Sequence, residues 1–260
     1  MEKKMELVKI EKLAVLIDAD NVTHKALDEL FQEIAKLGDV AVKRIYGDFT
    51  SPSNARWKEM LNEYAIKPIA QFAYTTGKNA SDSALIIDAM DLLHTGRFDG
   101  FCIVSSDSDF TGLAMRIKEE GLKVYGFGEK KTPKAFVRAC NKFTYIELLQ
   151  KTSPLLPAED KETDLNAGIQ QNQDNAATVS PSDAEDIPYD ILKKAIENSC
   201  DESGVALLSL VGSNILRIMP EFDPRSYKKG NAPLATIFRE KPEMFEVFGT
   251  GGTISVKIKN

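Results

Sequence analysis

Histidine and cysteine are scarce in this chain of 260 residues, which contains two of the former and three of the latter. Cys102, Cys140 and Cys200 stand at unrelated spacings, so neither a zinc-ligand set nor a disulfide framework is expected. No apolar run approaches the length of a membrane span, and the charged start MEKKMELVKIEK is not followed by an apolar block. These absences predict a cytoplasmic protein with reduced thiols and no membrane contact.

The formal net charge of -6 is unevenly distributed along the chain. Residues 151–186 carry two basic and eight acidic side chains, whereas residues 1–150 carry 21 and 22, and residues 187–260 carry ten and nine. The middle segment is also rich in Pro, Gln, Asn and Asp and has no sustained apolar period. It is therefore predicted to be a disordered acidic linker between two folded domains, at 1–150 and 187–260.

Before this linker, short apolar runs alternate with helical patterns. Strands are predicted at 13–17, 41–46, 68–74, 101–104 and 123–127. Helices are predicted at 23–36, 53–64, 81–94 and 110–119. The alternation predicts an α/β fold with a Rossmann-like parallel sheet and helices on both faces. In such sheets, ligands bind at the carboxyl ends of the strands, where the strand order reverses.

Carboxylates recur at the predicted strand ends. The first strand, in LAVLIDADN, ends in Asp18, and the fourth, in FCIVSSDSDF, is followed by Asp107 and Asp109. On the helix predicted at 81–94, Asp82 falls on the same face as the apolar residues, which predicts that it points inward. These four acids are therefore expected to converge on one cleft.

Four carboxylates that close together cannot all stay ionised without a cation. A site made only of oxygen ligands suits Mg²⁺ or Mn²⁺, and such an ion can activate water and offset charge on a phosphodiester during in-line attack. The chain has no GxxxxGK[ST] loop, which favours phosphodiester hydrolysis over triphosphate chemistry. The alternative is four independent solvated acids, with Asp82 placed in a first helical turn by the helix dipole.

Three ordered segments, LIDADN, GKNASDSALIIDAM and IVSSDSDFTGL, resemble the NYN domain, a branch of the PIN-like nuclease fold. The resemblance spans about residues 10–149. It implies a metal-dependent ribonuclease with the four acids in its centre. It also implies RNA contacts by Asn21 at the cleft entrance and by Lys78 or Asn79 beside the substrate phosphate. Asp88 matches a recurrent acid of the family, but its position on the helix flank favours a structural role.

The last part of the chain carries a second signature. Residues 204–247 resemble the LOTUS domain, also called OST-HTH, a small winged-helix unit, and the resemblance spans about residues 187–258. In this chain Lys228-Lys229 replaces a usual Gly. Helices are predicted at 207–218 and 233–239, and Gly-Gly between alternating residues predicts the wing hairpin. The resemblance implies RNA binding, with basic residues beside the second helix: Arg225, Lys228 and Lys229. Some members of the family bind proteins instead, and a solvated basic face is the alternative.

Three functions are left open. The leading hypothesis is a metal-dependent RNA endonuclease with a C-terminal RNA-binding module. The second keeps the fold without catalysis, as an RNA-binding or protein-interaction adaptor. The third is a phosphatase of the aspartyl-phosphate type, in which LIDAD would supply Asp18 as nucleophile and Asp82 would have no role. RNA is the expected partner, while a protein partner for the C-terminal domain and a homodimer remain open.

Overall fold

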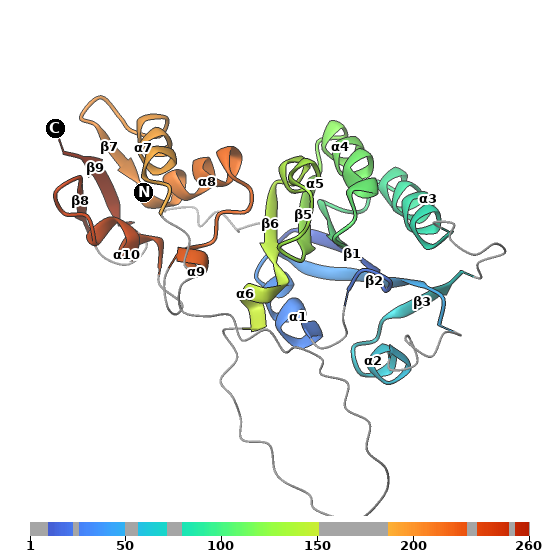
Figure 1. Ribbon diagram of the computed structural model, residues 1–260. Helices are drawn as coiled ribbons and strands as arrows, with labels where there is room; N and C mark the ends of the chain where they lie inside the picture. Colours follow the sequence, from blue (N-terminus) through green and yellow to red (C-terminus); the bar gives the residue numbers. More distant parts are fainter. Residues whose placement is uncertain are drawn as a thin grey trace, which may run out of the picture.

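The computed structural model describes residues 10–22, 26–49, 57–71, 80–150, 187–227, 233–249 and 253–259. A six-stranded parallel sheet with strand order β3-β2-β1-β4-β5-β6 organises the first 150 residues (Figure 1). Its strands are β1 (Lys12–Asp18), β2 (Asp39–Gly47), β3 (Lys67–Ala70), β4 (Gly100–Val104), β5 (Lys123–Gly128) and β6 (Lys142–Tyr145). The order reverses between β1 and β4, which makes the carboxyl ends of these two strands the expected ligand site.

Helices cover both faces of the sheet, as the alternating pattern predicted. They are α1 (Leu27–Ala35), α2 (Trp57–Glu63), α3 (Ala80–His94), η3 (a 3-10 turn, Ser108–Phe110), α4 (Thr111–Glu119), α5 (Lys134–Ala139) and α6 (Ile146–Gln150). Leu16 and Ile103 belong to the core under α3, α4 and α5, whereas Val15 and Cys102 belong to the core under α1, α2 and α6. Successive strand residues thus face opposite layers, which explains why β4 and residues 13–17 of β1 are apolar without interruption.

The five predicted strands and four predicted helices of this part are confirmed, with small differences at their ends. The sixth strand, β6, was not predicted because its sequence, KFTY, is short and carries polar residues at alternate positions. Its Phe143 and Thr144 are nevertheless buried, because β6 pairs with β5 at the edge of the sheet. Three parts of these predictions lie outside the described residues: the starts of the helices predicted from 23 and from 53, and the end of the strand predicted at 68–74.

Residues 187–259, which we call the C-terminal segment, have a core of their own. Its elements are α7 (Tyr189–Glu197), β7 (Val205–Leu207), α8 (Leu208–Ile218), α9 (Pro224–Tyr227), α10 (Leu234–Arg239), β8 (Phe245–Phe248) and β9 (Ser255–Ile258). The three strands form an antiparallel sheet in the order β7-β9-β8. The two predicted helices and the predicted hairpin are present as α8, α10 and the β8–β9 pair. The acidic linker predicted at 151–186 lies outside the described residues.

No helix among the described residues combines the length and the apolar character that a bilayer crossing requires.

Gly126 in β5 is a position where even a methyl group has no room. A Cβ placed there would lie 2.4 Å from Cδ2 of Phe143 and 2.7 Å from Sγ of Cys140. We expect Gly126→Ala to lower the free energy of unfolding by about 1–3 kcal/mol through overpacking, measured by urea denaturation. The matched control is Gly112→Ala in α4, where a Cβ meets nothing within 4 Å and the substitution should stabilise the helix by about 0.5–1 kcal/mol. Equal stabilities of the two variants would contradict this packing argument.

Candidate metal centre

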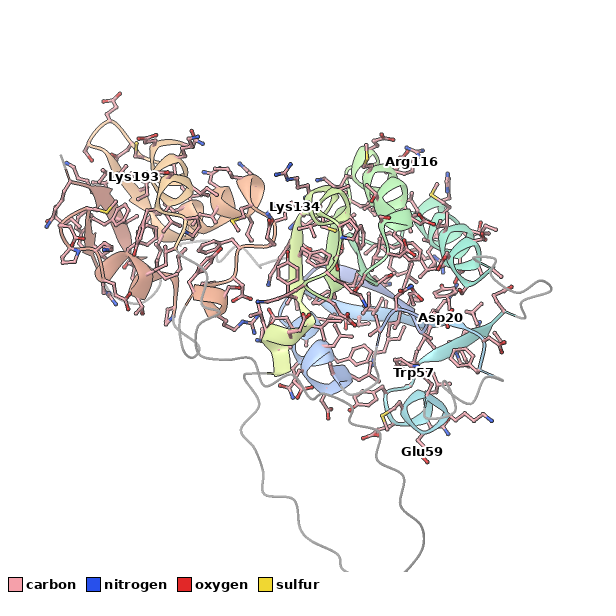
Figure 2. The ribbon with its side chains drawn as sticks, viewed as in Figure 1. Asp20, Trp57, Glu59, Arg116, Lys134 and Lys193 are labelled. Carbon is pink, nitrogen blue, oxygen red and sulfur yellow. The ribbon has the colours of Figure 1, made fainter. Side chains whose placement is uncertain are left out.

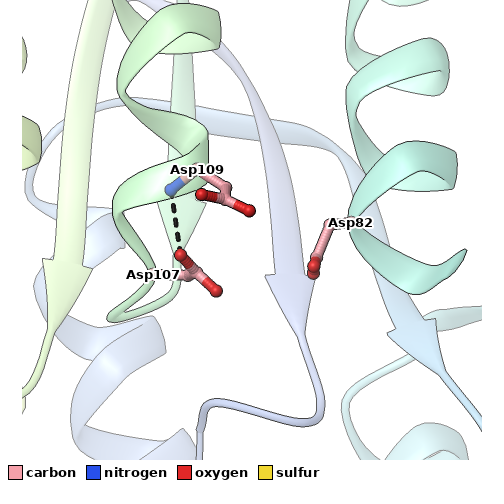
Figure 3. A group of neighbouring side chains, drawn as sticks. All are labelled: Asp82, Asp107 and Asp109. Atoms are coloured by element: carbon pink, nitrogen blue, oxygen red, sulfur yellow. Dashed lines mark hydrogen bonds between the residues drawn. The ribbon is translucent and has the colours of Figure 1, made fainter. Parts of the chain in front are cut away.

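Three carboxylates meet at the point where the strand order reverses. We call Asp82, Asp107 and Asp109 the acidic cluster; one carboxylate oxygen of each lies within 4.8 Å of those of the other two. Asp82 lies in the first turn of α3, whereas Asp107 and Asp109 lie just after β4. Figure 3 shows Asp82 pointing from α3 toward the two acids on the opposite side. The structure thus brings together three of the four acids that the sequence singled out.

The turn after β4 fixes the two neighbouring acids. The side chain of Asp107 caps η3 by accepting a hydrogen bond of 2.9 Å from the backbone N–H of Asp109 (Figure 3). The backbone N–H of Asp107 donates in turn to the hydroxyl of Ser105 at 3.0 Å. Short side chains that cap the backbone therefore turn the chain sharply, so that two acids two residues apart face the same space.

Asp18, the fourth acid, lies at the end of β1 and is 1% exposed. Its carboxylate accepts hydrogen bonds from the Ser105 hydroxyl at 2.7 Å, the Asn21 amide at 2.8 Å and the Asp20 backbone N–H at 3.0 Å. Burial raises the pKa of Asp18, while these three donors act in the opposite direction. Ser105 joins Asp18 to the acidic cluster, because it also accepts from the backbone of Asp107.

The carboxylate of Asp82 is buried and lies close to other acids. It is 8% exposed, and burial together with the charges of Asp18, Asp107 and Asp109 raises its pKa from 3.8 to about 6. Ionisation of Asp82 is therefore harder than that of an ordinary carboxyl group, and a bound cation would offset the neighbouring charges. Oxygen-only donors of this kind fit a hard divalent ion such as Mg²⁺ or Mn²⁺.

Comparison with models of known protein families identifies the family of this chain. A family model described as the NYN domain matches residues 12–147. The chain belongs to the NYN domain family. The matched range contains the whole six-stranded sheet and all four acids. The NYN domain has a PIN-like nuclease fold, and the acidic cluster of this NYN domain fits a divalent metal site.

Two solved structures resemble parts of the chain. A protein of unknown function from Vibrio parahaemolyticus is 20% identical with a TM-score of 0.44, and the match covers 55% of this chain and 94% of that one. An uncharacterized protein from Nitrosomonas europaea is 21% identical with a TM-score of 0.26, and its match covers 36% of this chain and 93% of that one. No curated protein matches the chain.

Other acids near the centre of the NYN domain have partners of their own. Asp20 accepts a hydrogen bond of 3.0 Å from the Ser81 hydroxyl, which ties the end of β1 to the start of α3. Asp88, on α3, is bound by the guanidinium of Arg44 and the hydroxyl of Tyr46 on β2. These contacts fix α3 against the sheet and agree with the structural role expected for Asp88.

The structure describes two of the six residues predicted to contact RNA, Asn21 and Arg225. The Asn21 amide donates a hydrogen bond to the carboxylate of Asp18. Arg225 is paired with Asp223 at 2.6 Å and with Glu33 of the NYN domain at 3.4 Å, so its charge is already compensated inside the protein. This placement does not favour the predicted phosphate contact by Arg225. Four of the predicted contacts lie outside the described residues: Lys78, Asn79, Lys228 and Lys229.

Ser105 supports the site through hydrogen bonds, although the sequence did not mark it as a site residue. A serine in a loop carries no sequence pattern that would indicate such a role. It is fully buried and serves both Asp18 and the backbone of Asp107. We expect Ser105→Ala to lower the free energy of unfolding in EDTA by about 1–3 kcal/mol, because a buried carboxylate and a backbone N–H each lose a partner.

The matched control for this substitution is Ser108→Ala at an exposed position of the same turn, for which a change within about 0.5 kcal/mol is expected. Urea denaturation of the two variants measures the difference. If Ser105→Ala proved as stable as the control, the bridging role of this hydroxyl would be wrong.

Proposed function

We propose that this NYN domain protein is an RNA endonuclease that hydrolyses phosphodiester bonds with Mg²⁺ or Mn²⁺. The observation that carries the proposal is the acidic cluster at the β1–β4 switch point, within a domain whose family has a PIN-like nuclease fold. Carboxylates from α3 and from the β4–η3 turn would hold the ion, and Asp18 would complete the site from the end of β1. When bound, the ion would supply an activated water and offset charge on the phosphodiester.

The chain's own residues would orient this centre. The three hydrogen bonds to Asp18 fix the direction of its carboxylate. The hydrogen bond from the backbone N–H of Asp109 fixes the direction of the Asp107 carboxylate. Asn21 would also meet the RNA backbone, and Lys78 or Asn79 would contact the substrate phosphate. Fixed carboxylates need little rearrangement when the ion and RNA bind, which is the main requirement for electrostatic catalysis.

We further propose that the C-terminal segment is a LOTUS domain that binds RNA. Support comes from the α8 helix, the short α10 helix and the β8–β9 pair, whose order matches a winged helix. Since Arg225 is engaged by two carboxylates, Lys228, Lys229 and the exposed Arg239 at the end of α10 are the better candidates for phosphate contacts. A tethered RNA-binding module would raise the local concentration of RNA near the acidic cluster.

The phosphatase alternative is weakened by the position of Asp82. That chemistry uses the acids of LIDAD and assigns no role to an acid on α3, yet Asp82 lies within 4.8 Å of Asp107 and Asp109. The adaptor alternative shares every structural feature of the nuclease and differs only in turnover.

A cleavage time course tests the proposal against both alternatives. End-labelled single-stranded and hairpin RNAs are incubated with the protein and Mg²⁺, Mn²⁺ or EDTA. We expect products that appear with either metal and are absent in EDTA. RNA binding without products under any metal would replace the nuclease with the adaptor, and hydrolysis of a small phosphate ester with a covalent intermediate on Asp18 would revive the phosphatase.

A further inference from the structure

The C-terminal segment contacts the NYN domain at β6 and α1 (Figure 1). The backbone N–H of Phe143 in β6 donates a hydrogen bond of 2.8 Å to the carbonyl of Pro220. Because β6 is the edge strand of the sheet, its outward N–H groups have no neighbouring strand to bond. The chain before α9 therefore accepts a hydrogen bond from an edge-strand amide of the NYN domain. Such a bond depends on direction as well as on distance.

Glu33 is the second point of contact, and its environment is unusual for a carboxylate. It lies in α1 and is 5% exposed. Lys36 and Lys142 of the NYN domain lie 2.8 and 3.1 Å from its oxygens, and Arg225 of the C-terminal segment lies 3.4 Å away. Burial raises the pKa of Glu33, but these three cations outweigh burial and lower the pKa to about 2. A buried carboxylate held in its charged form requires partners of this kind.

Arg225 is oriented for this contact by its own segment. Asp223 binds the guanidinium with both oxygens, at 2.9 Å and 3.0 Å from Nε and 2.6 Å from Nη2, and leaves Nη1 to face Glu33. Asp223 also accepts from the backbone N–H of Arg225 at 2.9 Å, which fixes the start of α9. The planar guanidinium is therefore held in place before docking, so that little side-chain freedom is lost on contact.

A shared apolar core does not join the two parts, because the buried apolar clusters of the described residues on the two sides have no residue in common. An open groove of about 410 Å³ lies at the junction, and residues from both sides line it, including Lys142, Leu216 and Phe222. Nor does the covalent connection force the two parts together, since the 36 residues from 151 to 186 could span up to about 120 Å when extended. The charged contact at Glu33 and the hydrogen bond at Phe143 are directional contacts that join the two parts.

We propose that the surface of the NYN domain formed by Glu33, Lys142 and Phe143 is a docking site for residues 220–225 of the same chain. Docking holds the C-terminal segment in one position beside β6. The contact is made within one chain, and it does not depend on whether the acidic cluster binds metal or cleaves RNA.

Small-angle X-ray scattering of the full chain tests this docking through charge reversal. Glu33→Arg places three cations around Arg225, and Arg225→Glu places a third acid beside Glu33 and Asp223. We expect each single variant to increase the radius of gyration by several ångströms, and the double variant to return it toward the wild-type value. The matched control is Lys193→Glu on α7, away from β6 (Figure 2), which should scatter like wild type.

Amide hydrogen exchange supplies a second measurement on the same variants. The Phe143 N–H should be protected at least about tenfold more in wild type than in either single variant, the ratio that corresponds to a contact of about 1.4 kcal/mol. Circular dichroism confirms that each variant is folded before comparison. Two results with wild type would overturn the proposal: scattering typical of separated units, or a Phe143 amide that exchanges without protection. Folded single variants that scatter like wild type would also overturn it. So would a contact that forms only in a dimer at high concentration.

Discussion

Replacement of Asp107 by asparagine is expected to reduce metal-dependent RNA cleavage on the order of 10³-fold, because several kcal/mol of charge stabilisation depends on an intact oxygen-ligand set. The substitution keeps the size of the side chain. It also keeps an oxygen that can accept from the backbone N–H of Asp109, so the turn after β4 should survive. The loss should therefore appear in the rate of cleavage at saturating RNA and not in the folded fraction of the protein.

Asp91→Asn is the matched control for this substitution. Asp91 lies on α3 like Asp82, but it is exposed and does not belong to the acidic cluster. The control should cleave at the wild-type rate within about twofold, measured on the same end-labelled RNA with Mg²⁺ and with Mn²⁺. Cleavage by Asp107→Asn at the rate of the control would remove the acidic cluster from the reaction.

Asp82→Asn is expected to stabilise the metal-free protein at pH 8. The pKa of Asp82 is raised from 3.8 to about 6 in the folded state, chiefly by burial and then by the neighbouring acids. A raised pKa favours folding of the protonated form, so this contribution to stability is present below pH 3.8 and is lost as the pH rises through about 6. Asparagine carries no charge at any pH and should raise the melting temperature in EDTA by a few degrees at pH 8, with a gain that disappears near pH 4.

Divalent metal should make wild type more stable than Asp82→Asn at pH 8. A ligand that binds only the folded state stabilises it by mass action, so Mn²⁺ should raise the melting temperature of wild type much more than that of Asp82→Asn. Thermal melts of both proteins at pH 4 and pH 8, with EDTA or Mn²⁺, give the melting temperatures for this comparison. A metal-free variant that is less stable than wild type at pH 8 would show that the acids do not repel one another as the structure indicates.

Much of the centre could be predicted because its elements follow local rules. Apolar runs mark β1 and β4 as central strands, and parallel strands bring their carboxyl ends to one edge, which places Asp18 and Asp107 close together. The inward direction of Asp82 follows from helical periodicity alone. These features depend on residues near one another in sequence and on the topology of the sheet.

The features that could not be predicted depend on contacts across the fold. Ser105 matters because it reaches Asp18, which is 87 residues away, and Arg225 reaches Glu33 over 192 residues. The sequence therefore predicts that Arg225 contacts RNA, whereas in the structure two carboxylates bind its guanidinium. β6 was missed for a related reason, since its burial comes from packing at the sheet edge and not from an apolar run.

The claim that the acids of this NYN domain form a divalent metal site is tested most directly by Mn²⁺ titration followed by electron paramagnetic resonance. Free Mn²⁺ gives a strong signal that weakens when the ion binds protein. At pH 8 we expect wild type to deplete the free signal, Asp107→Asn to leave it nearly unchanged and Asp91→Asn to behave like wild type. Binding by wild type should also weaken below pH 6, as Asp82 takes up a proton. Equal depletion by wild type and Asp107→Asn, or none by either, would contradict the metal site.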